Sequence, residues 1–238
     1  MVSDRRLRSY SMRVLRQPER VSGLIFDIDN TLYRNSAYLR AQADLLVERL
    51  AAELGDSVQR MGERVDAVRR IYAARTGGDK PSLANTFLEF GVDIETSARW
   101  REELYHPEQY LGVDRQLQRT MQRFASEVPI VAVTNNPRSI GVRTLECLGV
   151  SRWFRGVVGL DDSGVSKPHA TPFLRGLALL GDQADERPEA SEVVSVGDRI
   201  EVDLNPAMEL GMGAVYVESM EDVYELPHLL LGAGEHAR

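Results

Sequence analysis

The chain has 238 residues, of which 43% are hydrophobic and 27% are charged, as is usual for a globular protein. Its formal net charge of −7 argues against general affinity for nucleic acid polymers. No apolar run approaches the roughly 18 residues of a membrane-spanning helix. We therefore expect a soluble protein with neither a nucleic acid nor a membrane as partner.

The first twenty residues contain six arginines against two acidic residues. Serine is scarce there and no clean amphipathic run occurs, so the segment does not resemble an organellar transit peptide. We expect residues 1–20 to form a solvated or loosely docked extension.

Five short apolar runs, rich in β-branched residues, are expected to be strands covered on both faces of a parallel sheet. Helical patterns separate the later runs, which predicts a doubly wound, Rossmann-like α/β sheet. The predicted strands are residues 23–29, 129–136, 156–162, 192–198 and 213–219, and the helices are residues 138–148, 170–180 and 203–210. Gly149, Gly181 and Gly211 follow the last apolar turns of these helices, as C-terminal caps do.

The stretch from 34 to 111, between the first two strands, has helical patterns only. Apolar residues recur there at three- and four-residue spacing, and Gly77, Gly78 and Pro81 divide it near its middle. This stretch is too long for a single crossover between strands. We expect a helical cap domain at 34–111, inserted into a core formed by residues 21–33 and 112–238.

Cysteine and histidine indicate no further site. A lone Cys147 cannot form an internal disulfide, which is typical of a protein from the reducing cytoplasm. It lies in a helical pattern, so we expect a small core residue and not a nucleophile. The four histidines lack paired ligand spacing, and no zinc site is expected.

Two carboxylates follow the first predicted strand. Asp27 and Asp29 would point the same way from an extended backbone, and their like charges would disfavour each other's ionisation. Asp198 ends the fourth run, with Asp203 five residues further on. A hard divalent cation such as Mg²⁺ would neutralise this acidic cluster through oxygen ligands.

Further polar residues end the other strands. Thr134, Asn135 and Asn136 end the second run, and Lys167, one of only two lysines, follows the third. In an open parallel sheet, ligands bind outside the carboxyl ends of the strands, so these groups should meet in one cleft. Each motif alone is a common loop or helix cap. Their joint order favours a metal-assisted receptor for a phosphoryl group.

With these residues in place, the chain resembles the haloacid dehalogenase (HAD) superfamily of phosphohydrolases over residues 21–219. The motifs are "DIDNT" at 27–31, Thr134, Lys167 and "GDRIEVD" at 197–203. The helical stretch after the first motif is similar to the C1 cap of that superfamily. The resemblance implies a phosphatase that hydrolyses a small phosphomonoester, such as a phosphorylated metabolite.

The resemblance also implies roles for these residues. Asp27 would be the nucleophile that forms an aspartyl-phosphate, and Asp29 the general acid and base. Mg²⁺ would be held by the Asp27 carboxylate, the Asp29 backbone carbonyl and Asp198, with Asp203 in support. The acid at position 29 makes dehalogenation unexpected, because dehalogenating members lack it.

The phosphoryl oxygens would be bound by the Thr134 hydroxyl, the Asn135 N–H and Lys167. The family often has an aspartate two residues after the lysine, where this chain has His169 followed by Ala170. This departure leaves the support of Lys167 to be explained.

The stretch "FDIDNTLY" is similar to the opening of the pyrimidine 5′-nucleotidase-like branch, where Asn30 and Tyr33 recur. It points to a nucleoside 5′-monophosphate as substrate. We hypothesise that Asp79 or Lys80, in the break of the cap, contacts the leaving group; a solvated loop tip is the alternative.

Three alternatives use similar residues. A phosphomutase differs only in what attacks the aspartyl-phosphate, and a catalytically silent regulatory or binding protein could keep the scaffold. A response-regulator receiver domain also places acids, Thr and Lys around a phospho-aspartate, but in another order and without a helical insert. The sequence carries no signal for an oligomeric state.

Overall fold

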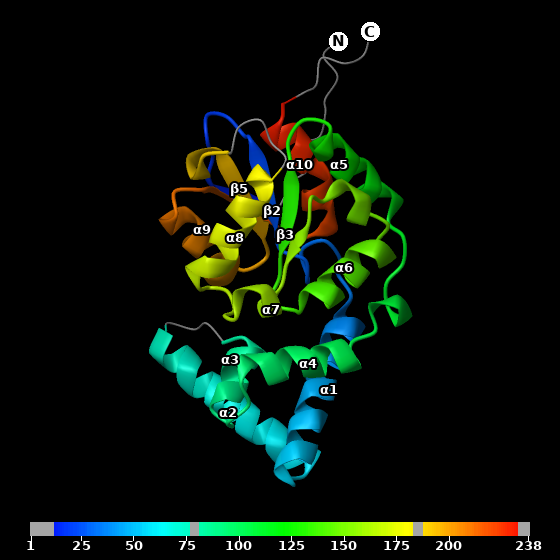
Figure 1. The fold of residues 1–238 in the computed structure, drawn as a ribbon, viewed down its shortest axis with the longest axis vertical. Coiled ribbons are helices and arrows are strands. Elements are labelled where there is room, and N and C mark those ends of the chain that lie inside the picture. Colours follow the sequence, from blue (N-terminus) through cyan, green and yellow to red (C-terminus); the bar gives the residue numbers. More distant parts are fainter. Residues whose placement is uncertain (1–11, 77–80, 183–187, 233–238) are drawn as a thin grey trace, which may run out of the picture.

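The computed structural model describes residues 12–76, 81–182 and 188–232. Their strands form a six-stranded sheet in the order β1-β6-β5-β2-β3-β4 (Figure 1). The strands β2 to β6 pair in parallel, whereas β1 is antiparallel to β6. The expected α/β class is confirmed. The strands are β1 (Arg13–Arg16), β2 (Gly23–Phe26), β3 (Ile130–Val133), β4 (Val157–Val158), β5 (Val193–Gly197) and β6 (Gly213–Tyr216).

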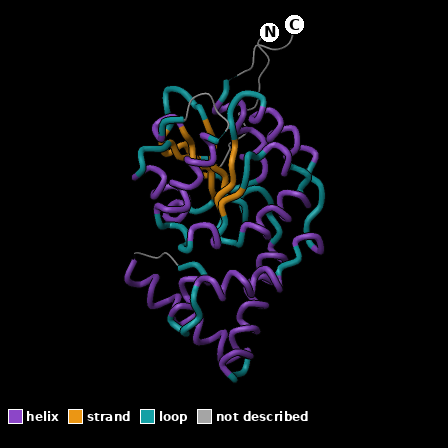
Figure 2. Tube along the Cα trace, viewed as in Figure 1, coloured by secondary structure: helices purple, strands orange, loops and turns teal. Residues whose placement is uncertain are grey.

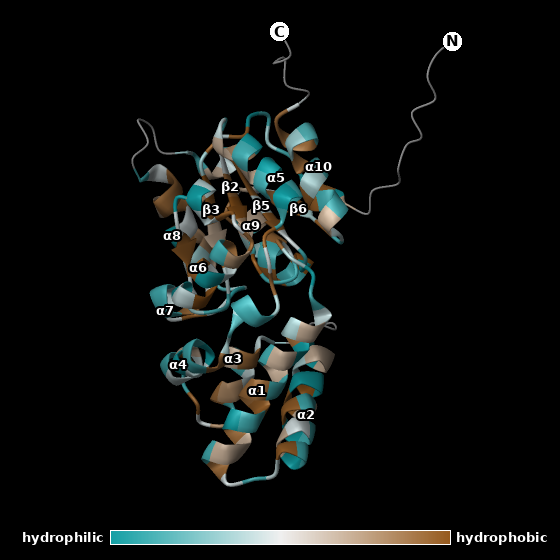
Figure 3. Cartoon of the chain, turned by 90° about the vertical axis from the view of Figure 1, so that its right-hand side faces the viewer, coloured by the Kyte–Doolittle hydropathy of each residue, from teal (hydrophilic) through white to brown (hydrophobic). Residues whose placement is uncertain are grey.

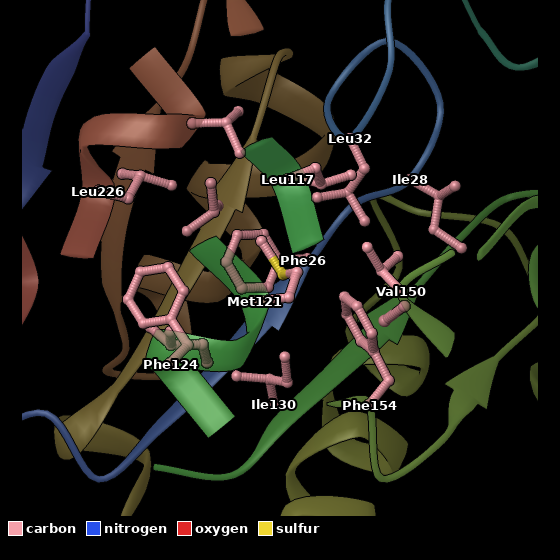
Figure 4. Packing of buried hydrophobic residues seen from close by; sticks show 14 of the residues in the cluster. Phe26, Ile28, Leu32, Leu117, Met121, Phe124, Ile130, Val150, Phe154 and Leu226 are labelled. Atoms are coloured by element: carbon pink, nitrogen blue, oxygen red, sulfur yellow. The ribbon is translucent and has the colours of Figure 1, made fainter. Parts of the chain in front are cut away.

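Helices cover both faces of the sheet, and the strands lie between them (Figure 2). The side chains of successive residues of β2 point to opposite faces of the sheet. Leu24 and Phe26 belong to one apolar cluster, and Figure 4 shows Phe26 beside Met121. Ile25 belongs to the cluster of the other face. The first face is covered by α5 (Arg115–Ala125), α6 (Arg138–Cys147) and α10 (Met220–Leu230), and the second by α8 (Ala170–Gly181) and α9 (Asn205–Glu209).

Two predicted elements have different bounds in the structure. The run 156–162 contains only the two-residue strand β4, after which the chain turns into α7 (Leu160–Ser163). The helix expected at 203–210 begins with the π-helical turn η4 (Ile200–Leu204) and continues as α9. The remaining short elements are the 3₁₀ turns η1 (Pro107–Gln109), η2 (Ser151–Trp153) and η3 (Ala190–Glu192).

The expected glycine caps are correct at two positions of three. Gly149 and Gly211 have φ angles of +74° and +92°. Glycine adopts this left-handed conformation without steric cost, because it has no Cβ. Gly181 is the last residue of α8, and the C-cap is Asp182 with an ordinary φ of −66°. No left-handed residue is therefore needed there.

Among the described residues between β2 and α5, all regular elements are helical. The α-helices are α1 (Ser36–Leu54), α2 (Val58–Thr76), α3 (Leu83–Leu88) and α4 (Ile94–Leu104), which we call the helical insert. Leu46, Met61, Phe87 and Trp100 form its apolar centre, which Ile140 of α6 joins. Figures 1 and 3 show the insert grouped beyond one end of the sheet, next to α7. The boundaries at 34 and 111 stay predictions.

Part of the N-terminal extension is an edge strand that the sequence analysis missed. Residues of β1 are exposed, yet Arg13 and Val14 pair with Tyr216 and Val215 of β6. The Arg13 guanidinium lies 4.6 Å from the centre of the Tyr216 ring. Residues 1–11 lie outside the described part of the chain. Within the described part, no helix is both long and apolar enough to cross a membrane.

The close approach of α8 to the sheet gives a stability prediction. A Cβ at Gly176 would lie 2.9 Å from Val133 Cγ2 and 3.1 Å from Ile25 Cδ1. Gly176→Ala should therefore lower the free energy of unfolding by about 1–3 kcal/mol through overpacking. Gly62→Ala in α2 is the matched control, because the nearest atom to its Cβ would be 3.9 Å away. It should raise stability by up to about 1 kcal/mol through helix propensity. Urea unfolding that moved both variants in the same direction would contradict this packing.

Candidate active site

The site lies at the carboxyl end of the sheet, where β2, β3 and β5 run side by side. Asp27 follows β2 directly, and its N–H donates to Val196 O of β5 at 2.9 Å. Thr134 follows β3, and Asp198 follows β5. Parallel pairing therefore brings together residues that are far apart in the sequence, and the helical insert covers the same end of the sheet.

Lys167 is almost fully enclosed in the site, with an exposed fraction of 1%. Its Nζ donates to Asp27 Oδ1 and to Asp203 Oδ1, each at 2.7 Å, and to Val133 O at 2.9 Å. An ammonium has three protons, and each of them has an acceptor here. Burial lowers the pKa of Lys167, but the carboxylates of Asp203 and Asp27 outweigh it and leave the pKa above its usual value. Lys167 is therefore a fixed positive charge.

Asp27 has both carboxylate oxygens engaged. Oδ1 accepts from Lys167, and Oδ2 accepts from the Thr31 hydroxyl at 2.8 Å. Burial raises the pKa of Asp27 to about 7 against the opposing effect of Lys167, and Asp203 and Asp198 add to the rise. The effect of burial on the Asp27 pKa therefore outweighs that of the neighbouring Lys167 ammonium.

The acidic cluster in the described residues consists of Asp27, Asp198 and Asp203, whose ligand oxygens lie within 4.8 Å of one another. Asn30, in a left-handed turn with φ +61°, donates to Asp198 Oδ2 at 2.6 Å. Asp198 Oδ1 is buried and has no hydrogen-bond partner, and burial raises the pKa of this carboxyl. An orphaned carboxylate oxygen beside two further carboxylates fits a hard divalent cation. These residues therefore suit the expected metal.

Asp203 differs from the other two members of the cluster. Its Oδ1 is bound to Lys167, and its Oδ2 accepts the backbone N–H of Arg199 at 3.2 Å. Its exposed fraction is 1%. Asp203 is thus arranged to hold Lys167 and the β5–η4 turn in place.

The side chain of Asp29 is turned toward a second set of donors. Oδ1 accepts from the Tyr33 hydroxyl at 2.7 Å. Oδ2 accepts from the Thr134 hydroxyl at 3.1 Å and from Asn136 Nδ2 at 2.9 Å. Asp29 and Asp27 therefore lie in the same site but have separate hydrogen-bond partners.

Asn135 contacts the lysine loop through its side chain. Its Oδ1 accepts the N–H of Lys167 at 2.7 Å, and its Nδ2 donates to Lys167 O at 3.3 Å. The next helix, α8, is capped by His169, whose Nδ1 accepts the N–H of Thr171 at 3.2 Å. Histidine thus performs a capping role that an aspartate side chain can also perform, which explains the departure after Lys167.

The helical insert touches this loop one residue before the lysine. The Ser166 hydroxyl donates to Asn85 Oδ1 at 2.9 Å and lies 3.2 Å from the Ser82 hydroxyl. Ser82 is also the N-cap of α3. The lysine loop is therefore in direct polar contact with the insert.

Sequence reasoning found the charged residues and missed several of their partners. Thr31 and Tyr33 each lie four residues after the carboxylate that they bind, a spacing that could have revealed both. Asn136 was noted only as part of its strand end. Asp79 and Lys80 lie outside the described residues, so their contact with a leaving group stays a hypothesis.

Comparison with known proteins identifies a family. A model described as haloacid dehalogenase-like hydrolase matches residues 21–211. A 5-amino-6-(5-phospho-D-ribitylamino)uracil phosphatase, YigB of Escherichia coli, is 26% identical over 92% of this chain and 95% of its own. Phosphoglycolate phosphatase of Pectobacterium atrosepticum is 29% identical over 75% and 72%. Glyceraldehyde 3-phosphate phosphatase of Methanocaldococcus jannaschii is 24% identical over 85% and 89%.

Solved structures have the same fold. A HAD phosphatase from Thermococcus onnurineus matches with a TM-score of 0.58 and 22% identity, covering 89% of this chain and 99% of that one. The HAD hydrolase YfnB of Bacillus subtilis, solved with bound magnesium, matches with a TM-score of 0.53 and 15% identity over 89% and 99%.

The enclosure of Lys167 predicts a large effect of removing its charge. Lys167→Met leaves the Asp27 and Asp203 carboxylates buried without a counter-ion, so the free energy of unfolding should fall by about 3–5 kcal/mol in metal-free buffer above neutral pH. Arg143→Met is the control, because its 2.8 Å ion pair with Glu108 is partly exposed and should contribute less than about 1 kcal/mol. Equal losses in urea unfolding would show that Lys167 is not a buried counter-ion.

Proposed function

Because this chain belongs to the haloacid dehalogenase-like hydrolase family, we propose that it is a Mg²⁺-dependent phosphatase that hydrolyses a small phosphomonoester through an aspartyl-phosphate on Asp27. Curated relatives at 24–29% identity are named as phosphatases of small phosphorylated compounds. The observation that carries the proposal is the arrangement of Asp27 and Asp29. They lie two residues apart, and separate donors bind each of them.

In the first step, an oxygen of Asp27 attacks phosphorus, and the bond from phosphorus to the leaving oxygen breaks. Asp29 gives a proton to the leaving oxygen and later takes one from the water that hydrolyses the aspartyl-phosphate. Lys167, 2.7 Å from Asp27 Oδ1, offsets negative charge on the nucleophile and on the phosphoryl group. The Asn135 N–H would bind a phosphoryl oxygen, and the Thr134 hydroxyl would bind another in place of its hydrogen bond to Asp29. The Asn135 side chain keeps the lysine loop in position.

Asp27, Asp198 and the backbone carbonyl of Asp29 would hold Mg²⁺, with Asp203 in support. When bound, the ion would polarise the phosphoryl oxygens and neutralise the carboxylates. The orphaned Asp198 Oδ1 supports this assignment. Asp203 already has both oxygens engaged by Lys167 and Arg199, which favours its supporting role.

A nucleoside 5′-monophosphate is the substrate class that the "FDIDNTLY" stretch favours, and its marker residues have contacts in the site. Asn30 donates to Asp198, and Tyr33 donates to Asp29. A phosphomutase would keep the same residues and pass the phosphoryl group to a second sugar phosphate. We favour water as the acceptor, because the curated relatives are named as phosphatases.

Phosphate release provides the direct test. The wild type should release inorganic phosphate from members of a panel of nucleotides, sugar phosphates and phosphoglycolate only when Mg²⁺ is present. Asp27→Asn should lower kcat by about 10³-fold or more, because the nucleophile is lost. Asp44→Asn, at an exposed position of α1, should retain full activity. Phosphate release by Asp27→Asn at the wild-type rate would rule out the aspartyl-phosphate.

The pH dependence of Mg²⁺ binding follows from the pKa of Asp27. Its folded value of about 7 lies above the ordinary 3.8, so without the ion the protonated carboxyl stabilises the fold at low pH. That contribution is lost as the pH rises through about 7. Mg²⁺ binds the deprotonated form, so the rise in Tm on adding Mg²⁺ should be larger near pH 8 than near pH 5. Asp198→Asn should remove most of this rise, and a pH-independent rise in the wild type would contradict the assignment.

A further inference from the structure

A group of buried polar side chains lies in the helical insert, outside the machinery described above. Tyr38 and Gln42 lie one turn apart on α1, with exposed fractions of 1% and 8%. Arg101 and Tyr105 lie at the end of α4, with exposed fractions of 4% and 2%. The Tyr105 hydroxyl donates to Gln42 O at 3.2 Å, which joins the two helices. We call these four residues the α1–α4 polar cluster.

Arg101 has no acidic partner within ion-pair distance among the described residues. Its Nη1 donates to Ser97 O at 2.8 Å and to Ser97 Oγ, and its guanidinium also interacts with the neutral Tyr105 hydroxyl. Burial lowers the pKa of Arg101, yet a guanidinium stays charged in proteins. A buried cation without an anion is costly, so the cluster is short of one negative group.

Two further polar atoms of the cluster also lack partners with good hydrogen-bond geometry. Tyr38 Oη and Gln42 Nε2 are both buried without a hydrogen bond of good geometry, and the only polar interaction between them is that of the Gln42 amide with the Tyr38 hydroxyl oxygen. Each can donate, as can the remaining N–H groups of Arg101. The proton of Tyr105 is committed to Gln42 O. The unused polar groups of the cluster are therefore donors, which suit an acceptor such as a carboxylate.

The cluster is next to the candidate general acid. Tyr33 binds Asp29 at 2.7 Å, and its ring lies 5.8 Å from the ring of Tyr38. Burial lowers the pKa of Arg101, and the Tyr105 hydroxyl and, to a smaller extent, the Asp29 carboxylate oppose that effect. Asp29 serves the leaving group in the proposed function, so the cluster lies on the leaving-group side of the site.

We propose that the α1–α4 polar cluster binds a carboxylate of the leaving group, and that the substrates are short phosphomonoesters of hydroxy acids. The proposal rests on the proposed function, and within its small phosphomonoesters it selects hydroxy-acid phosphates in place of the nucleoside 5′-monophosphates that the sequence resemblance favours. The guanidinium of Arg101 pairs with the carboxylate, while Tyr38 Oη and Gln42 Nε2 donate to its oxygens. All four side chains are buried, which favours a leaving group of a few atoms over a nucleobase.

A matched pair of substrates tests this directly. Phosphoglycolate and 2-hydroxyethyl phosphate differ only in a carboxylate against a hydroxymethyl group. We expect the wild type with Mg²⁺ to have a kcat/KM at least about 30-fold higher for phosphoglycolate, the effect of one desolvated charge pair. In Arg101→Gln this ratio should fall to within a few-fold of one, and Arg101→Lys should restore part of it. A merely structural Arg101 would lower both kcat/KM values and leave the ratio unchanged.

A second variant decides the matter if Arg101→Gln does not fold. Tyr38→Phe removes only a hydroxyl that has no hydrogen bond of good geometry, so its Tm should equal or exceed that of the wild type. The substrate ratio should nevertheless fall by about 5- to 10-fold. A buried phenylalanine is already tolerated in the core, at Phe26, and in the helical insert, at Phe87.

The outcomes separate the two proposals. Phosphate release from both compounds and from p-nitrophenyl phosphate, with a ratio near one in the wild type, overturns the carboxylate site alone. The carboxylate site is also overturned if Tyr38→Phe and Arg101→Gln both leave the ratio of the two kcat/KM values at its wild-type level. If no compound releases phosphate with Mg²⁺, the proposed function is overturned and the carboxylate site falls with it.

Discussion

The site depends on one buried ammonium shared between two carboxylates. Lys167 contacts Asp27 just after β2, Asp203 of η4 and the last carbonyl of β3, so it joins three segments of the core. Such an ion is stable only if all its protons have acceptors. The amide of Asn135 and the cap at His169 hold the backbone on either side of it. Much of the architecture at this end of the sheet therefore positions one charge.

The distribution of charge around Lys167 explains why a cation is expected in the site. Three carboxylates lie within ligand distance of one another, while Lys167 is the only ammonium that contacts them among the described residues. Arg199 is partly exposed, and its side chain approaches no closer than 3.8 Å. Burial is the main reason that the pKa of Asp27 rises to about 7, and the neighbouring carboxylates of Asp203 and Asp198 add to the rise. The protein thus carries an excess of negative charge that a divalent ion would balance.

The sequence predicted the parallel sheet and the charged residues for a clear physical reason. Strands buried on both faces are continuously apolar, and polar residues at their carboxyl ends stand out against that background. Edge strand β1 was missed because its arginines are exposed on a polar edge, where no apolar pattern forms. Strand β4 was overestimated because Leu160 is as buried in α7 as it would be in a strand. Arg101 was missed because an arginine in an amphipathic helix normally faces solvent; its burial depends on how α4 packs.

The contact between Ser166 and the helical insert has a consequence for engineering. Exchanging inserts between relatives would be a natural way to transplant substrate preference onto this core. The recipient lysine loop, however, meets the insert through Ser166, Ser82 and Asn85, one residue from the central ammonium. A foreign insert without matching hydroxyl and amide groups would lose these contacts and disturb the loop that carries Lys167. The transferable unit is therefore the insert together with residue 166.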